Sequence, residues 1–192
     1  MTVGETLLDI VAGKSPRAEG RPARGSERGV LKVSAVSWGE FRPEENKVLA
    51  NSFVVDPELT VRAGDVLISR ANTVELVGAV VQVERDHPQL MLSDKTLRLV
   101  PRPDLIEPRF LMYALRTTEV RAVFEEDATG TSDSMRNLSQ DKIKSAPIQL
   151  PPIDVQRRIV AKLDALLSQT RAAREQLEAV PALVEQYRQS VL

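Results

Sequence analysis

A heptad pattern at the C-terminal end constrains this chain more than any other feature. Apolar or small residues recur there at alternating steps of four and three residues. The seam consists of Ile159, Leu163, Leu166, Thr170, Ala173, Leu177, Val180, Val184, Tyr187 and Val191. Mostly polar or charged residues lie between these positions, as in a coiled-coil helix. A lone helix cannot bury such a stripe, so the stripe must pack on its own domain, another copy or a different subunit.

The predicted helix begins near Asp154, directly after Pro151 and Pro152. The prolines hold the chain extended, and the carboxylate suits the positive end of the helix dipole. An unbroken helix over 154–192 would be about 58 Å long, at about 1.5 Å per residue. Pro181 either bends or ends it, because proline lacks the N–H that an interior position needs. The plainer alternative is a core helix of a larger bundle.

Composition excludes several kinds of chemistry. The 192 residues include no cysteine, so disulfides, thiolate nucleophiles and zinc ribbons are excluded. His87 is the only histidine and lies in a turn-like Asp-His-Pro sequence, which disfavours a histidine metal site or a Ser-His-Asp triad. No run approaches the roughly 18 apolar residues of a membrane span, and no signal peptide is evident. We expect a cytoplasmic protein without a membrane segment.

Charge is unevenly distributed along the chain. The net charge is −1, but residues 14–28 carry five cationic and two acidic side chains among glycines and prolines. This composition predicts a basic loop. The loop is either a contact for nucleic acid or a solvated surface.

The rest of the chain predicts an α+β fold. Strands are expected at Val30–Val36, Phe53–Val55, Val77–Glu84 and Leu90–Val100, with Thr6–Ala12 as a strand or short helix. Within Val61–Arg70, a Gly-Asp turn is expected to lead into a buried strand. Crossover helices are missing between them, which favours a curled, mostly antiparallel sheet. Short helices are expected from Pro108 to Arg116, from Thr118 to Glu125, and from an N-cap at Ser139 to Lys144. A loop is expected at 127–134, where small residues predominate.

Motifs for catalysis are scarce. No phosphate-binding loop, nucleophile elbow or metal-spaced histidine pair is present, and we expect no cofactor. A magnesium nuclease can use carboxylates and a lysine, and Glu45-Asn46-Lys47 and Asp94-Lys95 offer these residue types. Neither of these two groups is preceded by a predicted strand that carries a second acidic residue, which such a nuclease site would need.

Polar side chains at strand ends and in loops are the better candidates for function. Arg70 and Asn72 follow a predicted buried strand, and these residue types read guanine and adenine edges through paired hydrogen bonds. Alternatively, Arg70 forms an ion pair with Asp65 or Glu75, and Asn72 bonds its own backbone in a turn. Phosphate contacts are expected from Lys14, Ser15, Arg17, Lys95, Ser132, Ser134 and Arg136.

Three segments resemble the specificity subunits of type I restriction–modification enzymes. They are GDVLISRANTVELVG (64–78), LSDKTLRLVP (92–101) and the stretch 128–167, which contains LPPIDVQRRIVAKLD (150–164). The N-terminal IVAGKSPR and VLKVSAVSWGEFRPEENK fit the same family. The most specific part is the junction at 150–164, where a target-recognition domain of that family meets its spacer helix.

The resemblance implies a non-catalytic subunit that binds double-stranded DNA. Each recognition domain of such a subunit reads half of a bipartite site, and long helices set the distance between the halves. Its partners are methyltransferase subunits, which bring S-adenosylmethionine, and often a restriction subunit. The implied division is a target-recognition domain at 1–150 and a spacer and dimerisation helix at 151–192.

The chain departs from the family in one respect. It is long enough for one recognition domain and one spacer helix, whereas the usual subunit carries two of each. Together with the heptad seam, this suggests a half-subunit whose helix pairs antiparallel with its twin, giving a two-fold homodimer. The expected dimerisation residues are Ile159, Leu163, Leu166, Leu177 and Val184. The alternatives are a structural adaptor that reads no DNA and a metal-dependent nuclease.

Overall fold

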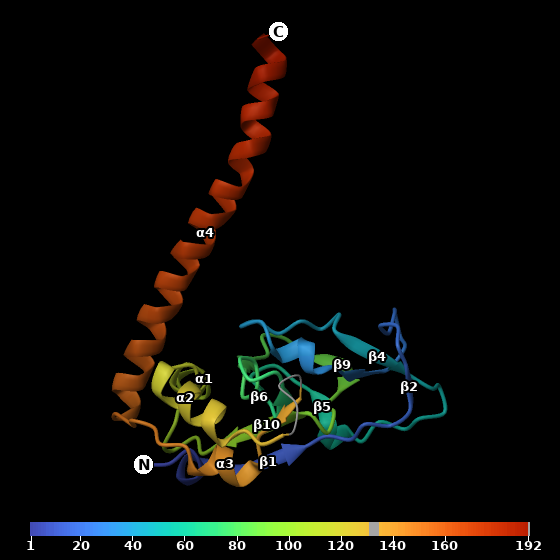
Figure 1. The fold of residues 1–192 in the computed structure, drawn as a ribbon, viewed down its shortest axis with the longest axis vertical. Helices are drawn as coiled ribbons and strands as arrows, with labels where there is room; N and C mark the ends of the chain where they lie inside the picture. The colour runs from blue at the N-terminus through green and yellow to red at the C-terminus, as the bar shows by residue number, and fades with distance from the viewer. Residues whose placement is uncertain (131–134, 192) are drawn as a thin grey trace.

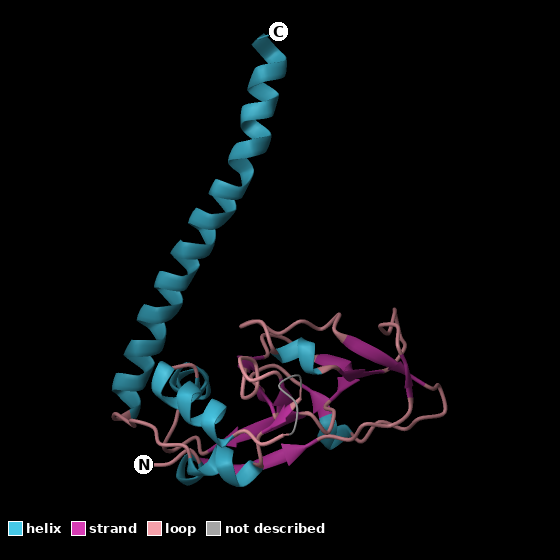
Figure 2. Cartoon of the chain, viewed as in Figure 1, coloured by secondary structure: helices cyan, strands magenta, loops and turns pink. Residues whose placement is uncertain are grey.

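A head of strands and short helices carries one long C-terminal helix in the computed structural model (Figure 1). The structure describes residues 1–130 and 135–191, and for 182–185, 188, 190 and 191 it describes only the backbone. The short α-helices gather at the end of the head from which the long helix rises, and most strands lie toward the other end (Figure 2). The predicted α+β class, with a long C-terminal helix, is confirmed.

A four-stranded antiparallel sheet forms the centre of the head, in the order β1-β10-β6-β8. Its strands are β1 (Leu7–Ala12), β10 (Thr96–Pro101), β6 (Val66–Ser69) and β8 (Val80–Gln82). All four residues of β6 are buried, as expected for a strand hydrogen-bonded on both edges and covered on both faces. The 3-10 helix η1 (Gly4–Thr6) leads into β1.

A second, five-stranded sheet has the order β2-β4-β3-β9-β5. It comprises β2 (Ala18–Glu19), β4 (Asn46–Leu49), β3 (Gly29–Leu31), β9 (His87–Met91) and β5 (Thr60–Val61). Within it β3 and β9 pair in parallel, and the remaining pairs are antiparallel. Two 3-10 helices, η2 (Val33–Val36) and η3 (Pro57–Leu59), belong to its connections. A two-stranded ladder joins β7 (Ala71–Asn72) to β11 (Arg136–Asn137).

Three short helices cover the four-stranded sheet: α1 (Pro108–Leu115), α2 (Thr118–Asp127) and α3 (Gln140–Ser145). Pro108 occupies the first turn of α1, and the Glu107 side chain caps that helix by accepting from the N–H of Phe110. Ser139 caps α3 through a hydrogen bond from the N–H of Lys142, as predicted. The largest core cluster lies between these helices and the sheet.

Three predicted strands need correction. Phe53–Val55 is not a strand, and the strand in this region is β4. The segment Val30–Val36 is a strand only to Leu31, because Val33–Val36 turns into η2 and buries Ala35 and Val36. The segment Leu90–Val100 contains parts of β9 and β10, separated by a turn that the Ser93 N–H closes by donating to Thr96 Oγ1, 2.9 Å away.

The long helix α4 runs from Ile153 to Val191 without interruption. Pro181 lies inside it and does not end it, although the proline ring deprives the carbonyl of Leu177 of its usual helical donor. At about 1.5 Å per residue, a helix of 39 residues is about 58 Å long.

The base of α4 is fastened to the head by buried polar contacts. Gln156 is fully buried; its Oε1 accepts from the N–H of Glu107 at 2.9 Å, and its Nε2 donates to the carbonyls of Leu105 and Pro151 at 2.9 and 2.8 Å. One turn further on, Val160 packs against the main core. Then Asp164 forms an ion pair with Arg109 at 2.8 Å and accepts a hydrogen bond from the hydroxyl of Tyr113.

Candidate nucleic-acid interface

Strand β6 ends at Ser69, and the next residue links three parts of the chain. The backbone N–H of Arg70 donates to the carbonyl of Lys95 at 2.9 Å, and the carbonyl of Arg70 accepts from the N–H of Leu138 at 2.8 Å. The turn before β10 and the segment after β11 are therefore held beside the end of β6. Since backbone hydrogen bonds make these links, the side chains of Arg70 and Lys95 are not used in them, whereas Leu138 is buried in the main core.

Asn72 and Arg136, which are far apart in the sequence, are direct partners in the ladder of β7 and β11. The side chain of Asn72 is half-buried and makes two internal hydrogen bonds. Its Nδ2 donates to Ser37 Oγ at 2.8 Å, and its Oδ1 accepts from the N–H of Thr73 at 2.9 Å. The turn-forming role considered for Asn72 is therefore present, and adenine reading by this amide would require exchange of these bonds.

Arg70 is half-buried, and its Nε is buried without a hydrogen-bond partner among the described residues. Of the two acids considered as its partner, Asp65 instead pairs with Arg98 at 2.9 Å. Both members of that pair are only 12% exposed. Burial raises the pKa of Asp65 despite the adjacent guanidinium group.

Ser15, Asp94 and Lys95 form a small polar cluster beside Arg70. Ser15 Oγ donates to the carboxylate of Asp94, which lies 3.4 Å from the ammonium group of Lys95. Partial burial opposes ionisation of Asp94, but the hydrogen bond from Ser15 and the positive charges of Lys95 and Arg70 outweigh it, so the pKa of Asp94 lies below its usual value. Asp94 is therefore ionised at neutral pH and holds the cations in place.

We use the name recognition cluster for Ser15, Arg70, Asn72, Lys95 and Arg136. All five were candidates from the sequence, and the structure brings them to one region of the head. Lys14 and Arg17 lie nearby in the chain, on the exposed segment between β1 and β2. Ser132 and Ser134 lie outside the described residues.

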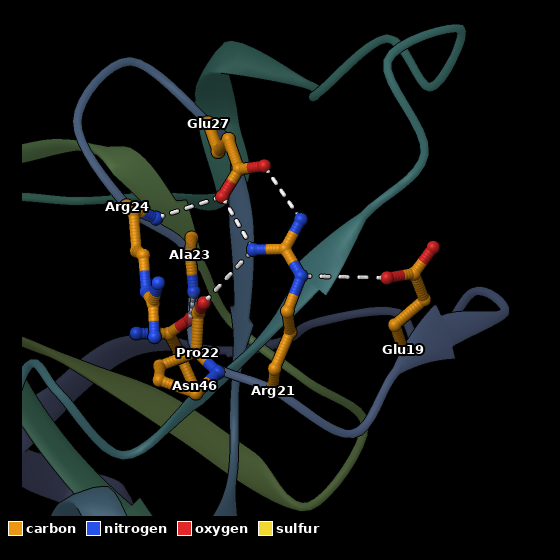
Figure 3. Close-up of polar contacts among 7 residues, drawn as sticks. All are labelled: Glu19, Arg21, Pro22, Ala23, Arg24, Glu27 and Asn46. Carbon is orange, nitrogen blue, oxygen red and sulfur yellow. Dashed lines mark hydrogen bonds and ion pairs between the residues drawn. The ribbon is translucent and has the colours of Figure 1, made fainter.

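The basic loop of residues 14–28 is held by its own acidic residues (Figure 3). Glu27 accepts two hydrogen bonds from the guanidinium group of Arg21, at 2.7 and 2.6 Å, and one from the N–H of Arg24 at 2.9 Å. These contacts, with Arg21 first, lower the pKa of Glu27 to about 2. Glu19 lies 3.5 Å from Arg21 on its other side. Arg21 is therefore neutralised within the loop and is a poor candidate for phosphate contact.

Two further lysines lie beside the recognition cluster, although the sequence did not indicate either of them as a phosphate contact. Lys32, after β3, and Lys47, in β4, line a pocket together with Ser15 and Lys95. Lys32 lies 3.5 Å from Glu45. The local sequence shows only that Lys32 follows the buried Leu31 and that Lys47 precedes the buried Val48. The pairing of β3 with β4 is what places both lysines beside the cluster.

The exposed part of α4 carries most of the predicted dimerisation seam. Ile159 is 37% exposed, Leu166 50% and Leu177 70%, whereas Leu163 is half-buried. The side chain of Val184 lies outside the described residues. Beyond its base, the apolar seam of α4 is therefore not covered by the head.

Chemistry that needs a metal finds little support here. Among residues 1–130 and 135–191, no three histidine, aspartate or glutamate side chains are grouped closely enough to hold a metal ion. Glu45 accepts a hydrogen bond from Ser34 at 2.7 Å, and Asp94 is engaged as described above. The same described part of the chain contains no helix that is both long and apolar enough to cross a membrane.

The head thus gathers polar and cationic side chains in the recognition cluster and carries one long helix that extends away from it. Residues 43–182 match the family described as the type I restriction modification DNA specificity domain. The chain belongs to this family.

Named relatives agree with this assignment. The chain is 33% identical over 192 residues to the type I restriction enzyme EcoEI specificity subunit of Escherichia coli, covering 95% of this chain and 32% of the relative. It is 25% identical over 165 residues to the EcoKI specificity subunit of Escherichia coli strain K12, covering 85% and 35%. The chain thus spans about a third of the length of these curated relatives.

Solved structures share the fold. One, described as showing complex assembly and conformational transition of the type I restriction–modification system, gives a TM-score of 0.65 at 25% identity over 93% of this chain and 40% of that one. The HsdS subunit from Thermoanaerobacter tengcongensis gives a TM-score of 0.61 at 22% identity, over 91% and 38%. The second likeness concerns the fold alone.

Proposed function

We propose that this chain recognises a specific sequence in double-stranded DNA, as a specificity component of a type I restriction–modification system. Residues 1–150 are the target-recognition domain, and residues 151–192 are the spacer and dimerisation helix. The observation that carries this proposal is the recognition cluster, in which backbone hydrogen bonds bring polar and cationic side chains together beside the C-terminal end of β6. The Nε of Arg70 is buried without a hydrogen-bond partner among the described residues, so a movement of this side chain toward an acceptor on DNA would relieve an unpaired donor.

The side chains of the cluster have different roles in the proposed complex. Arg70 reads a base edge or holds a phosphate close to it. Lys95 and Arg136, with Lys14 and Arg17 on the neighbouring segment, contact phosphates and fix the orientation of the duplex. Lys32 and Lys47 extend this positive surface. Asp94 keeps Ser15 and Lys95 in position, and its charge disfavours a phosphate directly against it.

The proposed partners are a methyltransferase subunit, a restriction subunit and a second copy of this chain. The exposed seam of α4 supports the last of these, because an apolar stripe of this length is stable in water only when covered. Two copies related by a two-fold axis present two identical recognition domains, and such a dimer prefers an interrupted palindrome. The chain itself is proposed to be non-catalytic and to need no cofactor.

DNA binding is tested by selecting duplexes from a pool with a randomised centre and measuring their affinity at several salt concentrations. Arg70→Ala is expected to lower the affinity for the selected site by roughly 1–3 kcal/mol and to relax the preference at one base pair. Lys95→Ala is expected to weaken binding to all sequences alike and to reduce the salt slope by about one unit.

The control is Lys144→Ala, which removes an exposed lysine from α3, a helix that contacts η1 on the N-terminal segment. It should change neither the selected sequence nor the salt slope. Absence of salt-dependent binding at every sequence would refute the proposal and leave the structural adaptor as the better explanation. Magnesium-dependent cleavage by the purified chain would identify a nuclease instead.

A further inference from the structure

Trp38 is the only tryptophan of the chain and is 54% exposed. A single exposed apolar side chain is ordinary on a protein surface and needs no explanation by itself. Trp38 differs because the backbone on both sides of it is anchored and because it lies beside the recognition cluster.

The residues before Trp38 are fixed in the interior. Ala35 and Val36 are completely buried in η2, and Ser37 is 7% exposed. Ser37 Oγ donates to the carbonyl of Val33 at 2.8 Å and accepts from Asn72 Nδ2 at 2.8 Å. The backbone that leads into Trp38 therefore has little conformational freedom.

The residues after Trp38 are anchored as well. Gly39 has a φ of +81°, which permits a sharp turn that residues with a side chain rarely adopt. Its carbonyl accepts from Arg116 Nη2 at 2.6 Å, and the N–H of Arg42 donates to the carbonyl of Ala35 at 2.9 Å. A rigidly supported indole loses little conformational entropy on binding, which is why tryptophan serves well as a contact residue.

The surroundings of the indole are polar and cationic. The hydrogen bond between Ser37 and Asn72 places Trp38 next to the ladder that carries Arg136. The guanidinium carbon of Arg42 lies 5.8 Å from the centroid of the tryptophan ring, and the same guanidinium group pairs with Glu40 at 3.2 Å. The cationic side chains of the recognition cluster, rather than Arg42, are therefore the candidates for phosphate contact here. An aromatic ring beside such side chains is a combination with which proteins hold nucleic acid, by stacking on bases and neutralising phosphates.

We propose that Trp38 is a DNA-contacting residue, whose ring packs against the apolar part of a base and thereby contributes to sequence preference. This inference deepens the proposed function and depends on it. The contact has two possible sources in the DNA: the methyl group of a thymine in the major groove, or the face of a base at an opened step. Both are apolar surfaces of a base.

The indole itself reports on the contact, because the chain has no other tryptophan. The intact protein is titrated with the selected duplex while its intrinsic fluorescence and its accessibility to iodide are recorded. A fluorescein-labelled copy of the duplex gives the affinity independently by anisotropy. Contact predicts a change of tryptophan emission and protection from iodide, both saturating at the duplex concentration that saturates the anisotropy.

Variants then test what the ring contributes. Trp38→Ala is expected to weaken binding of the selected duplex by at least about fivefold, in line with the loss of one stacked base, and Trp38→Phe by less. Leu8→Ala is the control, since Leu8 is an apolar side chain of β1 that is 64% exposed. Thermal unfolding of each variant checks that the fold is intact.

Replacing thymines of the selected duplex by uracil separates the two sources. Loss of affinity at one position in the parent, absent in Trp38→Ala, identifies a thymine methyl as the contact. Equal binding of the uracil duplex, with protection of the indole retained, identifies a base face. Either result supports the proposal.

Failure of this inference is distinguishable from failure of the proposed function. Tight DNA binding by anisotropy, with unchanged tryptophan emission and full affinity in Trp38→Ala, would overturn the role of Trp38 and leave DNA recognition standing. In that case the exposed indole is better explained as a contact for a protein subunit. Absence of DNA binding by anisotropy would overturn both.

Discussion

Replacing Gln156 by alanine should release the base of α4 from the head. The side chain is fully buried and makes three hydrogen bonds of 2.8–2.9 Å to backbone groups of two loops. A typical intramolecular hydrogen bond contributes about 1 kcal/mol net, and an unsatisfied buried partner costs about 1–3 kcal/mol. We therefore expect Gln156→Ala to lower the free energy of unfolding by about 3 kcal/mol.

Urea denaturation followed by circular dichroism measures this effect. With a slope of about 2 kcal/mol/M, a loss of about 3 kcal/mol moves the midpoint down by roughly 1.5 M. Parent and variants must be compared at one protein concentration, because association through α4 would add to the apparent stability.

Gln169→Ala is the matched control, since it makes the same change at an exposed position of the same helix. Surface substitutions of this kind are usually within about 0.5 kcal/mol of the parent. If Gln156→Ala lost less than about 1 kcal/mol relative to Gln169→Ala, the three bonds would not be what fastens the helix.

Three further outcomes follow from the structure. Leu166→Asp should give monomers that still fold, whereas Ser168→Asp, outside the seam, should keep the dimer mass; equal masses by light scattering for both variants would place the helix contact elsewhere. Asp164→Asn should lower the free energy of unfolding at neutral pH, and its deficit relative to the parent should shrink below about pH 4. The reason is that partial burial is outweighed by hydrogen bonds from Tyr113 and Arg109, which lower the pKa of Asp164 in the folded state. A deficit that stays constant from pH 7 to pH 3 would contradict this. Arg70→Ala should leave thermal stability unchanged or slightly raised, since it removes a buried donor without a partner among the described residues; a large loss would indicate a structural role.

Local signals in the sequence sufficed where one residue decides the conformation. Pro108 starts α1, Ser139 caps α3, and the double proline at 151 and 152 precedes α4. The heptad period identified α4 because it is long and regular. Its continuity through Pro181 was not predictable, since neither a bend nor an end could be preferred from local rules.

Strand prediction failed where an apolar pattern lacked a neighbouring strand. Phe53 and Val55 are partly buried against one core cluster and Val54 is 81% exposed, so the alternation typical of a strand is present. Nevertheless no ladder forms there. A strand requires hydrogen-bonding partners, and which segments pair depends on the whole fold. The turn at Ser93–Thr96 could have been found, because serine and aspartate commonly begin such turns.

In the candidate site, the residue types could be read from the sequence, whereas the proximity of the residues depends on contacts between distant segments. Residue type identified Arg70, Asn72, Lys95 and Arg136, but their proximity comes from the pairing of β7 with β11 and from the backbone bonds of Arg70. The internal bonds of Asn72 were among the alternatives that local chemistry predicted. The contribution of Ser37, and through it the position of Trp38, depends on a contact between distant segments that no local pattern signals.

The way in which the recognition cluster is built has a consequence for specificity. Arg70 is held in position by hydrogen bonds of its own backbone N–H and carbonyl, and β7 is joined to β11 by backbone hydrogen bonds. The fold therefore needs the backbone at these positions more than the side chains. Side chains at 70 and 95 can be exchanged at small cost to stability, provided that their replacements leave no buried group unpaired. Substitutions in the recognition cluster can therefore change the DNA sequence that is recognised, while the head and α4 keep their geometry. Asn72 is the exception, because its side-chain amide donates a hydrogen bond to Ser37. We expect a substitution of Asn72 to disturb the backbone that positions Trp38 as well.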